Sequence, residues 1–296
     1  MSGIKFQFDV DVVRAVSIAE VLRDMIKKGH PLLQMPEYKC LEELSSLGVE
    51  ERKLALFYTY VISVDYLTDA EKLWRNACEV FIHHPEKFTP DYILSIDELS
   101  LQNLLRELGV RYYRKDVSTW RKISQILIEK YGGEPRKITP QPLRIEEIKK
   151  RLNEFPNLRG DKLSNFYIRV MGETGLFKVE NLNELDIAVD IQVTRFTIYT
   201  GVLRLKCGTF RGSPCTQILR DSVQKVWRDA AKTVGVAPWE LDEPIWTIGS
   251  KLCTNRKTIN ERTCLQSSEC PVNTFCDKTV GMIFKKGYII WGSKPC

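Results

Sequence analysis

Lys162 and Asp190 are two side chains whose types and surroundings could together do covalent chemistry. Lys162 comes just after the turn-forming stretch FPNLRG at 155–160, and Asp190 directly precedes an apolar pattern that starts at Ile191. A lysine in the first turn of a helix lies beside the positive end of the helix dipole, which disfavours its ammonium form and leaves part of the amine neutral and nucleophilic. A carboxylate working with such an amine could accept its proton or stabilise developing positive charge.

The turn before Lys162 joins two helical patterns. Apolar residues at three- and four-residue intervals predict helices over 145–152 and 161–171. Between them, Pro156 fixes its own φ, while Asn157 and Gly160 tolerate left-handed backbone angles. The stretch is therefore predicted to be a helix, a hairpin and a second helix, whose first backbone N–H groups could hold a phosphate.

Simpler interpretations of both residues exist. Lys162 alone could be a solvated surface charge. Asp190 alone could be nothing more than the N-cap of the helix that begins at Ile191. The combination favours chemistry, because a glycine-x-lysine sequence after a hairpin is followed by the run IAVDIQVTR at 187–195.

These motifs resemble the helix-hairpin-helix DNA glycosylases of the endonuclease III type. Those proteins carry a hairpin ending in glycine-x-lysine and then a valine-aspartate-x-histidine-valine-x-arginine run, and the likeness covers roughly residues 54–277. The chain departs from them at Asn157, which stands where the family usually has its first glycine, at one additional residue before Gly160, and at Gln192, which replaces the histidine. The interval from Lys162 to Asp190 is longer than in endonuclease III and closer to the archaeal 8-oxoguanine glycosylase branch.

The resemblance implies a base-excision-repair DNA glycosylase with AP lyase activity. A damaged nucleotide is flipped out of the duplex, Lys162 attacks C1′ of its sugar as the base leaves, and the resulting Schiff base permits strand cleavage. Asp190 accepts the lysine proton or stabilises positive charge on the sugar. Retention of the lysine favours oxidised bases, with 8-oxoguanine foremost.

The same resemblance implies a set of DNA-contacting residues. These are Asn157, Arg159, Gly160 and Arg195. For Arg195 a structural ion pair is an equal alternative to a phosphate contact. Two other functions stay open for the whole chain: an N-glycosidase that acts on free nucleosides or nucleotides, and a catalytically inactive DNA-binding relative.

Four cysteines near the C-terminus indicate a loop folded around a metal. They are Cys253, Cys264, Cys270 and Cys276, separated by ten, five and five residues in a polar segment that lacks apolar side chains to order itself. The family resemblance favours a [4Fe–4S] cluster, whereas zinc and two disulfides remain alternatives. In each case the bound loop would hold basic residues against the DNA backbone: Lys251, Arg256, Lys257 and Arg262.

The remaining cysteines give weaker predictions. Cys207 and Cys215 flank the short loop GTFRGSP and could form a disulfide in a thermophile, or be two thiols. Spacing nominates no partner for Cys40, Cys78 or Cys296, and we expect Cys78 to be buried in a helix.

Basic and aromatic residues alternate in the run RYYRKDVSTWR at 111–121. Its aromatics could stack or wedge in the gap left by a flipped base. The simpler interpretation, which we favour, is that Tyr112 and Trp120 pack between helices while the charges face solvent.

The fold class predicted is all-α, with two helical domains, an interdomain catalytic cleft, the cluster loop and a small C-terminal β-hairpin at 282–292. Helical patterns occupy nearly the whole chain: 13–28, 50–66, 69–82, 96–108, 117–131, 145–152, 161–171, 193–205 and 216–234. The resemblance implies a helical barrel domain with the hairpin at 55–180 and a second domain formed by 1–54 plus 181–296.

Composition is consistent with a DNA-binding protein. The 296 residues carry a formal net charge of +6, a modest bias toward polyanions. The amphipathic N-terminal pattern is not a signal sequence, and no stretch is long and apolar enough for a membrane. We expect a monomer in the cytoplasm, associated with the nucleoid, whose partner is double-stranded DNA with a damaged base and not a membrane.

Overall fold

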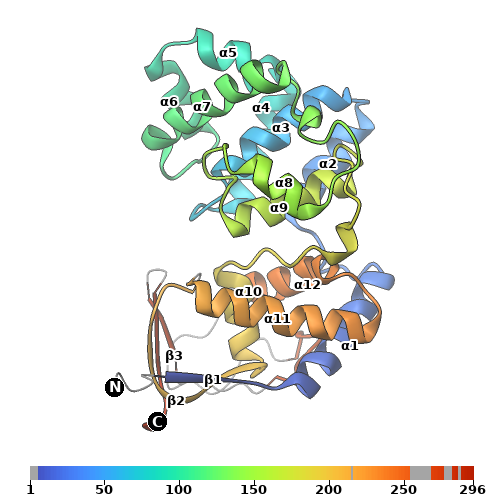
Figure 1. Cartoon of the computed structure of the whole chain (residues 1–296), viewed down its shortest axis with the longest axis vertical. Coiled ribbons are helices and arrows are strands. Elements are labelled where there is room, and N and C mark those ends of the chain that lie inside the picture. The colour runs from blue at the N-terminus through green and yellow to red at the C-terminus, as the bar shows by residue number, and fades with distance from the viewer. Residues whose placement is uncertain (1–5, 215, 254–267, 277–281, 286–287) are drawn as a thin grey trace. The chain divides into compact units, whose positions relative to one another are not determined.

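The computed structural model describes residues 6–214, 216–253, 268–276, 282–285 and 288–296 (Figure 1). The backbone divides into two compact units. The central unit is Met35–Leu185, and the terminal unit combines Met1–Gln34 with Asp186–Cys296. The divisions fall at 34/35 and 185/186, whereas the sequence prediction placed them at 54/55 and 180/181.

The central unit is helical (Figure 1). Its α-helices are α2 (Pro36–Ser46), α3 (Glu51–Val64), α4 (Ala70–His83), α5 (Pro90–Ser95), α6 (Glu98–Glu107), α7 (Tyr113–Tyr131), α8 (Ile145–Leu152) and α9 (Asp161–Glu173). Short 3₁₀ turns lie at Pro85–Phe88, Pro135–Ile138 and Leu182–Glu184. Every residue of α3 from Ala55 to Val64 is buried, as expected of a helix surrounded by others.

Aromatic packing around α3 forms much of this core. The Phe57 ring lies 4.8 Å from Phe81, 5.3 Å from Phe88 and 6.0 Å from Trp74, measured between ring centroids. Aromatic pairs at these separations add to the free energy gained by burying their area. Helix α3 is thereby packed against α4 and the 3₁₀ turn at Pro85–Phe88.

Helix α2 was not predicted, and three contacts attach it to the central unit. Glu37 forms an ion pair with Arg169 of α9. The Tyr38 hydroxyl donates to the Glu173 carboxylate at 2.9 and 3.0 Å. The third is a disulfide. These contacts explain why residues 35–54 fall in the central unit.

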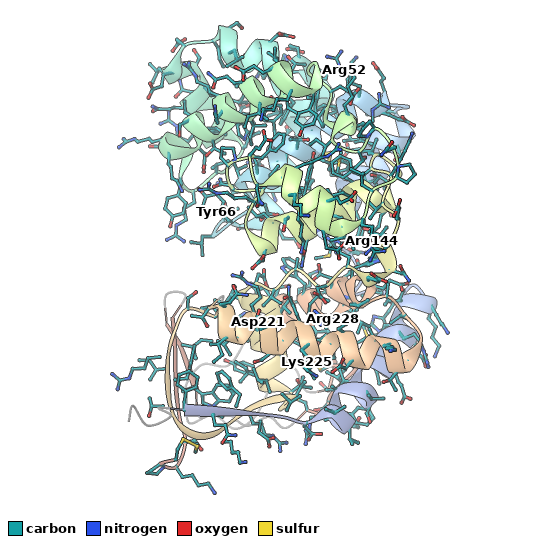
Figure 2. All side chains as sticks on the ribbon, viewed as in Figure 1. Arg52, Tyr66, Arg144, Asp221, Lys225 and Arg228 are labelled. Atoms are coloured by element: carbon teal, nitrogen blue, oxygen red, sulfur yellow. A yellow bond between two sulfur atoms is a disulfide. The ribbon has the colours of Figure 1, made fainter. Side chains whose placement is uncertain are left out.

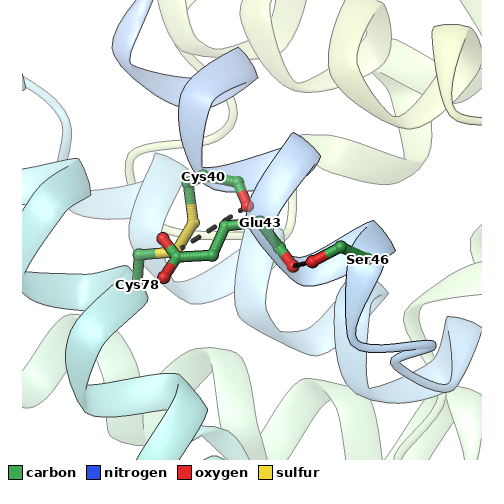
Figure 3. The surroundings of a disulfide bond; sticks show 4 residues. All are labelled: Cys40, Glu43, Ser46 and Cys78. Atoms are coloured by element: carbon green, nitrogen blue, oxygen red, sulfur yellow. Dashed lines mark hydrogen bonds between the residues drawn. A yellow bond between two sulfur atoms is a disulfide. The ribbon is translucent and has the colours of Figure 1, made fainter.

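Cys40 of α2 forms the disulfide with Cys78 of α4, with a Cα–Cα distance of 5.7 Å (Figure 3). The Cys78 Sγ lies 3.7 Å from the Cys40 carbonyl oxygen and 3.6 Å from the Glu43 carboxylate. Cys78 is buried in a helix as predicted. Its partner was missed because 38 residues separate the two cysteines and only the packing of α2 on α4 brings them together.

The terminal unit combines helices with an antiparallel sheet (Figure 1). Its α-helices are α1 (Val12–Lys27), α10 (Ile191–Tyr199), α11 (Gln217–Val234) and α12 (Asp242–Thr247), followed by a single π-helical turn at Ile248–Leu252. A 3₁₀ turn precedes α12 at Pro238–Leu241. Helix α1 packs on α11, and the buried Trp227 of α11 donates its indole N–H to the Thr197 hydroxyl at 2.9 Å.

The sheet has the strand order β1 (Phe6–Val10), β2 (Leu203–Gly212), β4 (Tyr288–Gly292) and β3 (Met282–Lys285), with every neighbouring pair antiparallel. The predicted C-terminal hairpin is confirmed as β3 and β4. Strands β1 and β2 were not predicted, so the sheet is larger than expected. Within the described residues it belongs to the terminal unit and leaves the helical fold class unchanged.

The predicted helix over 193–205 is wrong in its second half. Helix α10 ends at Tyr199, Gly201 has a left-handed φ of 76°, and β2 begins at Leu203. Along β2, burial alternates, which is the period of a strand with one face in the core. A glycine in this backbone region is a common helix terminator, and it separates two apolar patterns that we had merged.

Cys207 pairs with Cys296, with a Cα–Cα distance of 4.8 Å. The proposed disulfide between Cys207 and Cys215 is therefore wrong. Backbone hydrogen bonds from Gly208 N to Lys294 O at 2.7 Å and from Ser293 N to Gly208 O at 2.9 Å place the C-terminal residues beside β2. Among the described residues, no helix combines the length and apolar character needed to cross a membrane.

Candidate active site

The hairpin between α8 and α9 is anchored by two side chains with no exposed surface, Phe155 and Leu158. Asn157 has the left-handed φ of 64° that its type permits. Gly160 has φ −77° and ψ 142°, so it does not adopt the left-handed backbone that glycine tolerates. Gly160 is the N-cap residue of α9 and offers no side chain to bond the first-turn N–H groups.

The Asn157 side chain is used to hold the hairpin in place. Its Nδ2 donates to the Ser63 carbonyl oxygen at 2.9 Å and lies 3.4 Å from Asp116 Oδ1. Asp116 is fully buried and also accepts the Tyr66 hydroxyl at 2.9 Å. Burial raises the pKa of Asp116, although hydrogen bonds from Tyr66, Thr119 and Asn157 act in the opposite direction. The Asn157 amide nitrogen is therefore engaged within the central unit.

Lys162 lies in the first turn of α9, as predicted, and its side chain is 26% exposed. Its Nζ donates to the carbonyl oxygen of Asp65 at 2.9 Å and lies 3.9 Å from Asp65 Oδ1. Asp65 is the C-cap of α3, the negative end of that helix. The amine therefore lies between the positive end of α9, as the sequence indicated, and the negative end of α3, which the sequence did not indicate.

The face of α9 that follows Lys162 is aromatic and cationic. The Phe166 ring centroid lies 5.9 Å from Lys162 Nζ and 5.1 Å from Arg169 Cζ. Arg169 is 1% exposed and contacts the Tyr38 ring as well as Glu37. Phe166 is buried.

Asp190 is the N-cap of α10, so the predicted capping role is confirmed. Its Oδ1 accepts from Gln192 N at 2.7 Å and from Val193 N at 3.0 Å. Its Oδ2 accepts the indole N–H of Trp246 at 3.2 Å. The carboxylate is thereby fixed in orientation while remaining partly exposed.

The chain that leads to Asp190 is held on α11. Arg228, labelled in Figure 2, forms two hydrogen bonds with the Asp186 carboxylate at 2.6 and 2.7 Å. Gln224 Nε2 donates to the Ile187 carbonyl oxygen at 3.3 Å. The segment before Asp190 is therefore restrained although it lacks regular secondary structure.

Arg195 bridges α10 to the turn at 248–252. Its Nη1 donates to Gln192 Oε1 at 2.5 Å and to the Gly249 carbonyl oxygen at 3.3 Å. Gly249 lies against the backbone of Gln192 so closely that a Cβ would be 2.4 Å from the Gln192 carbonyl oxygen. Glutamine at 192 thus supplies an acceptor for Arg195, and these two hydrogen bonds of Arg195 join parts of the terminal unit.

Of the four cysteines proposed to bind a metal, three are described. Cys253 is buried directly after the turn at 248–252, Cys270 is half-buried, and Cys276 Sγ lies 3.3 Å from the Tyr199 carbonyl oxygen. Cys264 lies outside the described residues, as do Arg256, Lys257 and Arg262. Within the described part, no group of three or more His, Cys, Asp or Glu side chains is arranged to hold a metal ion.

The basic and aromatic run at 111–121 divides into buried and exposed parts. Trp120 is fully buried, as favoured, and donates to the Tyr60 carbonyl oxygen at 3.1 Å. Tyr112 is 38% exposed and stacks on Tyr66, labelled in Figure 2, at 5.7 Å between ring centroids with an 11° interplanar angle. Lys115 lies over the other ring of this pair, that of Tyr66, at 5.5 Å.

The hairpin residues and Lys162 thus lie together in the central unit, whereas Asp190 and Arg195 lie together in the terminal unit. Two contributors escaped the sequence analysis. Asp65 could not be recognised from the sequence as a partner of Lys162, because 97 residues separate the two along the chain. Trp246 contacts Asp190 although 56 residues separate them along the chain.

Comparison with known proteins gives matches of two kinds. A family model described as AGOG, N-glycosylase/DNA lyase, matches residues 162–278. A trapped covalent intermediate of endonuclease III with DNA, in an estranged-adenine complex, is similar in structure with a TM-score of 0.56 and 18% identity, over 89% of this chain and 96% of that one. A non-covalent endonuclease III–DNA complex has a TM-score of 0.54 and 19% identity, over 89% and 95%.

A third structure, 8-oxoguanine DNA glycosylase from Pyrobaculum aerophilum with 8-oxoguanosine, has a TM-score of 0.44 and 18% identity, over 81% of this chain and 88% of that one. No curated protein sequence matches the chain.

The fold is similar to that of endonuclease III, which confirms the predicted all-α fold class with a helix-hairpin-helix motif. Residues 162–278 are similar to the family described as AGOG, N-glycosylase/DNA lyase, and the structural likeness to endonuclease III concerns the fold.

Proposed function

We propose that this chain removes an oxidised base, with 8-oxoguanine foremost, from duplex DNA and then cleaves the strand as an AP lyase. Lys162 is the nucleophile, and Asp190 supplies the negative charge that the reaction needs. The observation that carries the proposal is the placement of Lys162, a partly exposed amine held at the start of α9 directly behind an anchored hairpin.

The reaction balances with these two side chains. The neutral amine of Lys162 forms a bond to C1′ while the bond from C1′ to the base breaks, and the base leaves with the bonding electrons and takes up a proton. The attached nitrogen then gives up one of its two protons to a base and keeps the other. The sugar ring opens as O4′ takes up a proton, which gives a positively charged imine that retains one N–H. Loss of a proton from C2′ expels the 3′ phosphate by β-elimination.

Asp190 is suited to this role because two backbone N–H groups and one indole N–H hold its carboxylate in one orientation. It stabilises positive charge on the sugar or accepts the lysine proton. Endonuclease III, which shares the fold, forms a covalent intermediate with DNA, and we extend that chemistry to Lys162.

DNA contact is proposed for the hairpin and for Arg195. The start of α9 presents backbone N–H groups with no capping side chain, and Arg159 beside it is exposed. Such a helix end suits a phosphate group. We propose that the protein binds duplex DNA as a monomer, with an affinity that falls as salt rises.

We also propose that Cys253, Cys264, Cys270 and Cys276 bind a [4Fe–4S] cluster, with zinc as the alternative. Thiolates are the usual ligands of both. The cluster would order the segment after α12 and takes no part in the steps above. Iron, sulfide and zinc content of the anaerobically purified protein, compared with Cys276→Ser, tests this: loss of iron and sulfide in the variant supports the cluster, and absence of both metals from the wild type overturns it.

The decisive experiment is borohydride trapping on duplexes that carry 8-oxoguanine, thymine glycol, uracil or an abasic site. We expect a covalent adduct with an oxidised base that disappears in Lys162→Ala. Lys178→Ala is the matched control, since it removes an exposed lysine just after α9. The adduct should persist in this control.

Other outcomes would contradict parts of the proposal. Base release without trapping would mean that Lys162 is not the nucleophile and that Asp190 activates water. Reaction with free nucleosides but with no duplex would favour the nucleosidase alternative. Binding of duplex DNA without reaction on any lesion would favour an inactive relative.

A further inference from the structure

We propose that Asp65 is the positioning residue for Lys162, through its backbone carbonyl and its carboxylate together. The inference rests on the proposed function, since it concerns the same amine. Asp65 lies in the central unit with Lys162, so both partners belong to one compact body.

The geometry fixes the nitrogen atom from two directions. Lys162 Nζ donates to the Asp65 carbonyl oxygen at 2.9 Å, and Asp65 Oδ1 lies 3.9 Å away. The lysine side chain has four rotatable bonds and would otherwise sample many positions. A nucleophile held near one position loses less entropy when it reacts.

Asp65 is itself held rigidly. Its Oδ2 accepts the indole N–H of Trp74 at 3.0 Å, and its backbone N–H donates to the Ile62 carbonyl oxygen at 3.1 Å. The Asp65 side chain is 9% exposed and Trp74 is 1% exposed. One carboxylate oxygen therefore faces the buried indole, and the other is left on the side of the amine.

The loop that carries Asp65 is locked in an unusual conformation. Leu67, two residues later, has a left-handed φ of 51° and is 64% exposed. A non-glycine residue in this region costs free energy and persists only where the surroundings determine it. Tyr66, between the two, is hydrogen bonded to Asp116 and stacked on Tyr112, so both flanks of the loop are fixed.

Charge gives Asp65 a second effect on the same atom. A carboxylate near an ammonium group favours the charged form, and the C-terminal end of α3 acts in the same direction, whereas the N-terminal end of α9 opposes both. The positively charged imine formed later occupies the same nitrogen. Asp65 therefore stabilises the cationic form before and after attack, while the proton leaves Lys162 through another group.

The test compares single-turnover trapping rates across pH for the wild type, Asp65→Asn and Asp69→Asn. Asp69 is the matched control, because it belongs to the same loop and caps α4 through Lys72 N at 3.2 Å, a cap that asparagine preserves. In the plot of trapping rate against pH, we expect Asp65→Asn to lower the plateau rate about tenfold, because the amine is less well positioned. We also expect the rise in rate at low pH to move about one pH unit lower, because the amine then loses its proton more readily.

Asp69→Asn should change neither quantity. Trp74→Phe keeps the carboxylate charge but removes the donor that orients it. This variant should lower the plateau rate and leave unchanged the pH at which the rate rises. This variant carries the test if Asp65→Asn does not fold, as judged by thermal denaturation.

The outcomes separate the two proposals. If the wild type is trapped, Lys162→Ala is not, and Asp65→Asn keeps both the wild-type plateau rate and the pH at which the rate rises, then the positioning role is overturned and the proposed function stands. An unchanged plateau in Trp74→Phe would overturn the orienting role in the same way. If the wild type forms no adduct with any duplex, the proposed function fails, and this inference fails with it.

Discussion

Lys162 and Asp190 belong to different units and are stabilised by backbone groups of opposite kind. Lys162 donates to a carbonyl oxygen at the C-terminal end of α3, whereas Asp190 accepts from two N–H groups at the N-terminal end of α10. Each of these contacts joins a side chain to a helix end whose partial charge suits it, although Lys162 itself belongs to the first turn of α9.

The difference lies in what each residue does for its own helix. Asp190 caps α10 and would stabilise that helix in a protein with no activity at all. Lys162 is not the cap of its own helix, since the N-cap residue of α9 is Gly160, whose carbonyl oxygen accepts from Ser164 N at 2.8 Å. A lysine in this position is therefore stronger support for chemistry than the aspartate is, and substitutions should separate activity from stability differently in the two units.

The largest expected effect is on the free energy of unfolding and tests the buried ion pair between Glu37 of α2 and Arg169 of α9. Arg169→Met should lower the free energy of unfolding by about 3–5 kcal/mol, because it leaves the buried Glu37 carboxylate without its cation. Urea denaturation monitored by circular dichroism measures it. The double variant Glu37→Gln/Arg169→Met should recover much of the loss, and equal losses in the single and double variants would show that the buried charge is not the cause.

A second comparison separates the two roles of Asp190. Asp190→Asn retains a good N-cap but removes the charge, so the trapping rate should fall about 100- to 1000-fold with little change in melting temperature. Asp190→Ala should lose the same activity and about 1 kcal/mol of stability as well. Normal trapping by Asp190→Asn would leave Asp190 with its capping role only.

The packing behind Asp190 gives an intermediate effect. Gly249→Ala places a Cβ 2.4 Å from the Gln192 carbonyl oxygen, where only backbone movement can relieve the clash. We expect a loss of about 1–3 kcal/mol in thermal denaturation. Gly292→Ala is the control, since nothing lies within 4 Å of its added Cβ. Equal stability of the two variants would mean that the contact of α10 with the turn at 248–252 is not tight.

The smallest expected effect concerns the anchoring of the hairpin at different pH. Burial raises the pKa of Asp116 above 3.8 in the folded protein, so the folded state holds this proton more tightly than the unfolded chain does. Stability from this group is therefore greatest below pH 3.8 and declines as pH rises through the folded value. Asp116→Asn should gain melting temperature relative to the wild type between pH 4 and pH 7, by a few degrees at most.

A constant difference between Asp116→Asn and the wild type across this range would contradict the shift. Thr119→Val is a useful companion, because it removes one donor to Asp116, the Thr119 hydroxyl at 3.2 Å, and leaves the carboxylate to titrate.

Local signals predicted the hairpin and both helices beside it. The hairpin is indicated by the turn preferences of Pro156 and Asn157, and the following helix by the apolar spacing of 161–171. Both signals involve only neighbouring residues, so the sequence alone reveals them. Helix α2 was missed although Pro36 opens it. What keeps it in place is contact with α4 and α9, and such contacts leave no periodic signal.

Contacts between distant segments account for most of what was not predicted. Asp65 meets Lys162 only because α3 packs on α9. Likewise, Cys207 pairs with Cys296 because the last residues lie along β2, whereas the nearer Cys215 looked more plausible from spacing alone. Residue type can nominate a reactive lysine, but the groups that control it come from the tertiary fold.

The disulfide between Cys40 and Cys78 makes a covalent ring of the chain between them. The ring contains α3 and the loop with Asp65, so the segment that holds Lys162 is tied at both ends. A protease that cuts once inside this ring opens it without releasing either fragment, and the two pieces should separate on a denaturing gel only after a reductant is added.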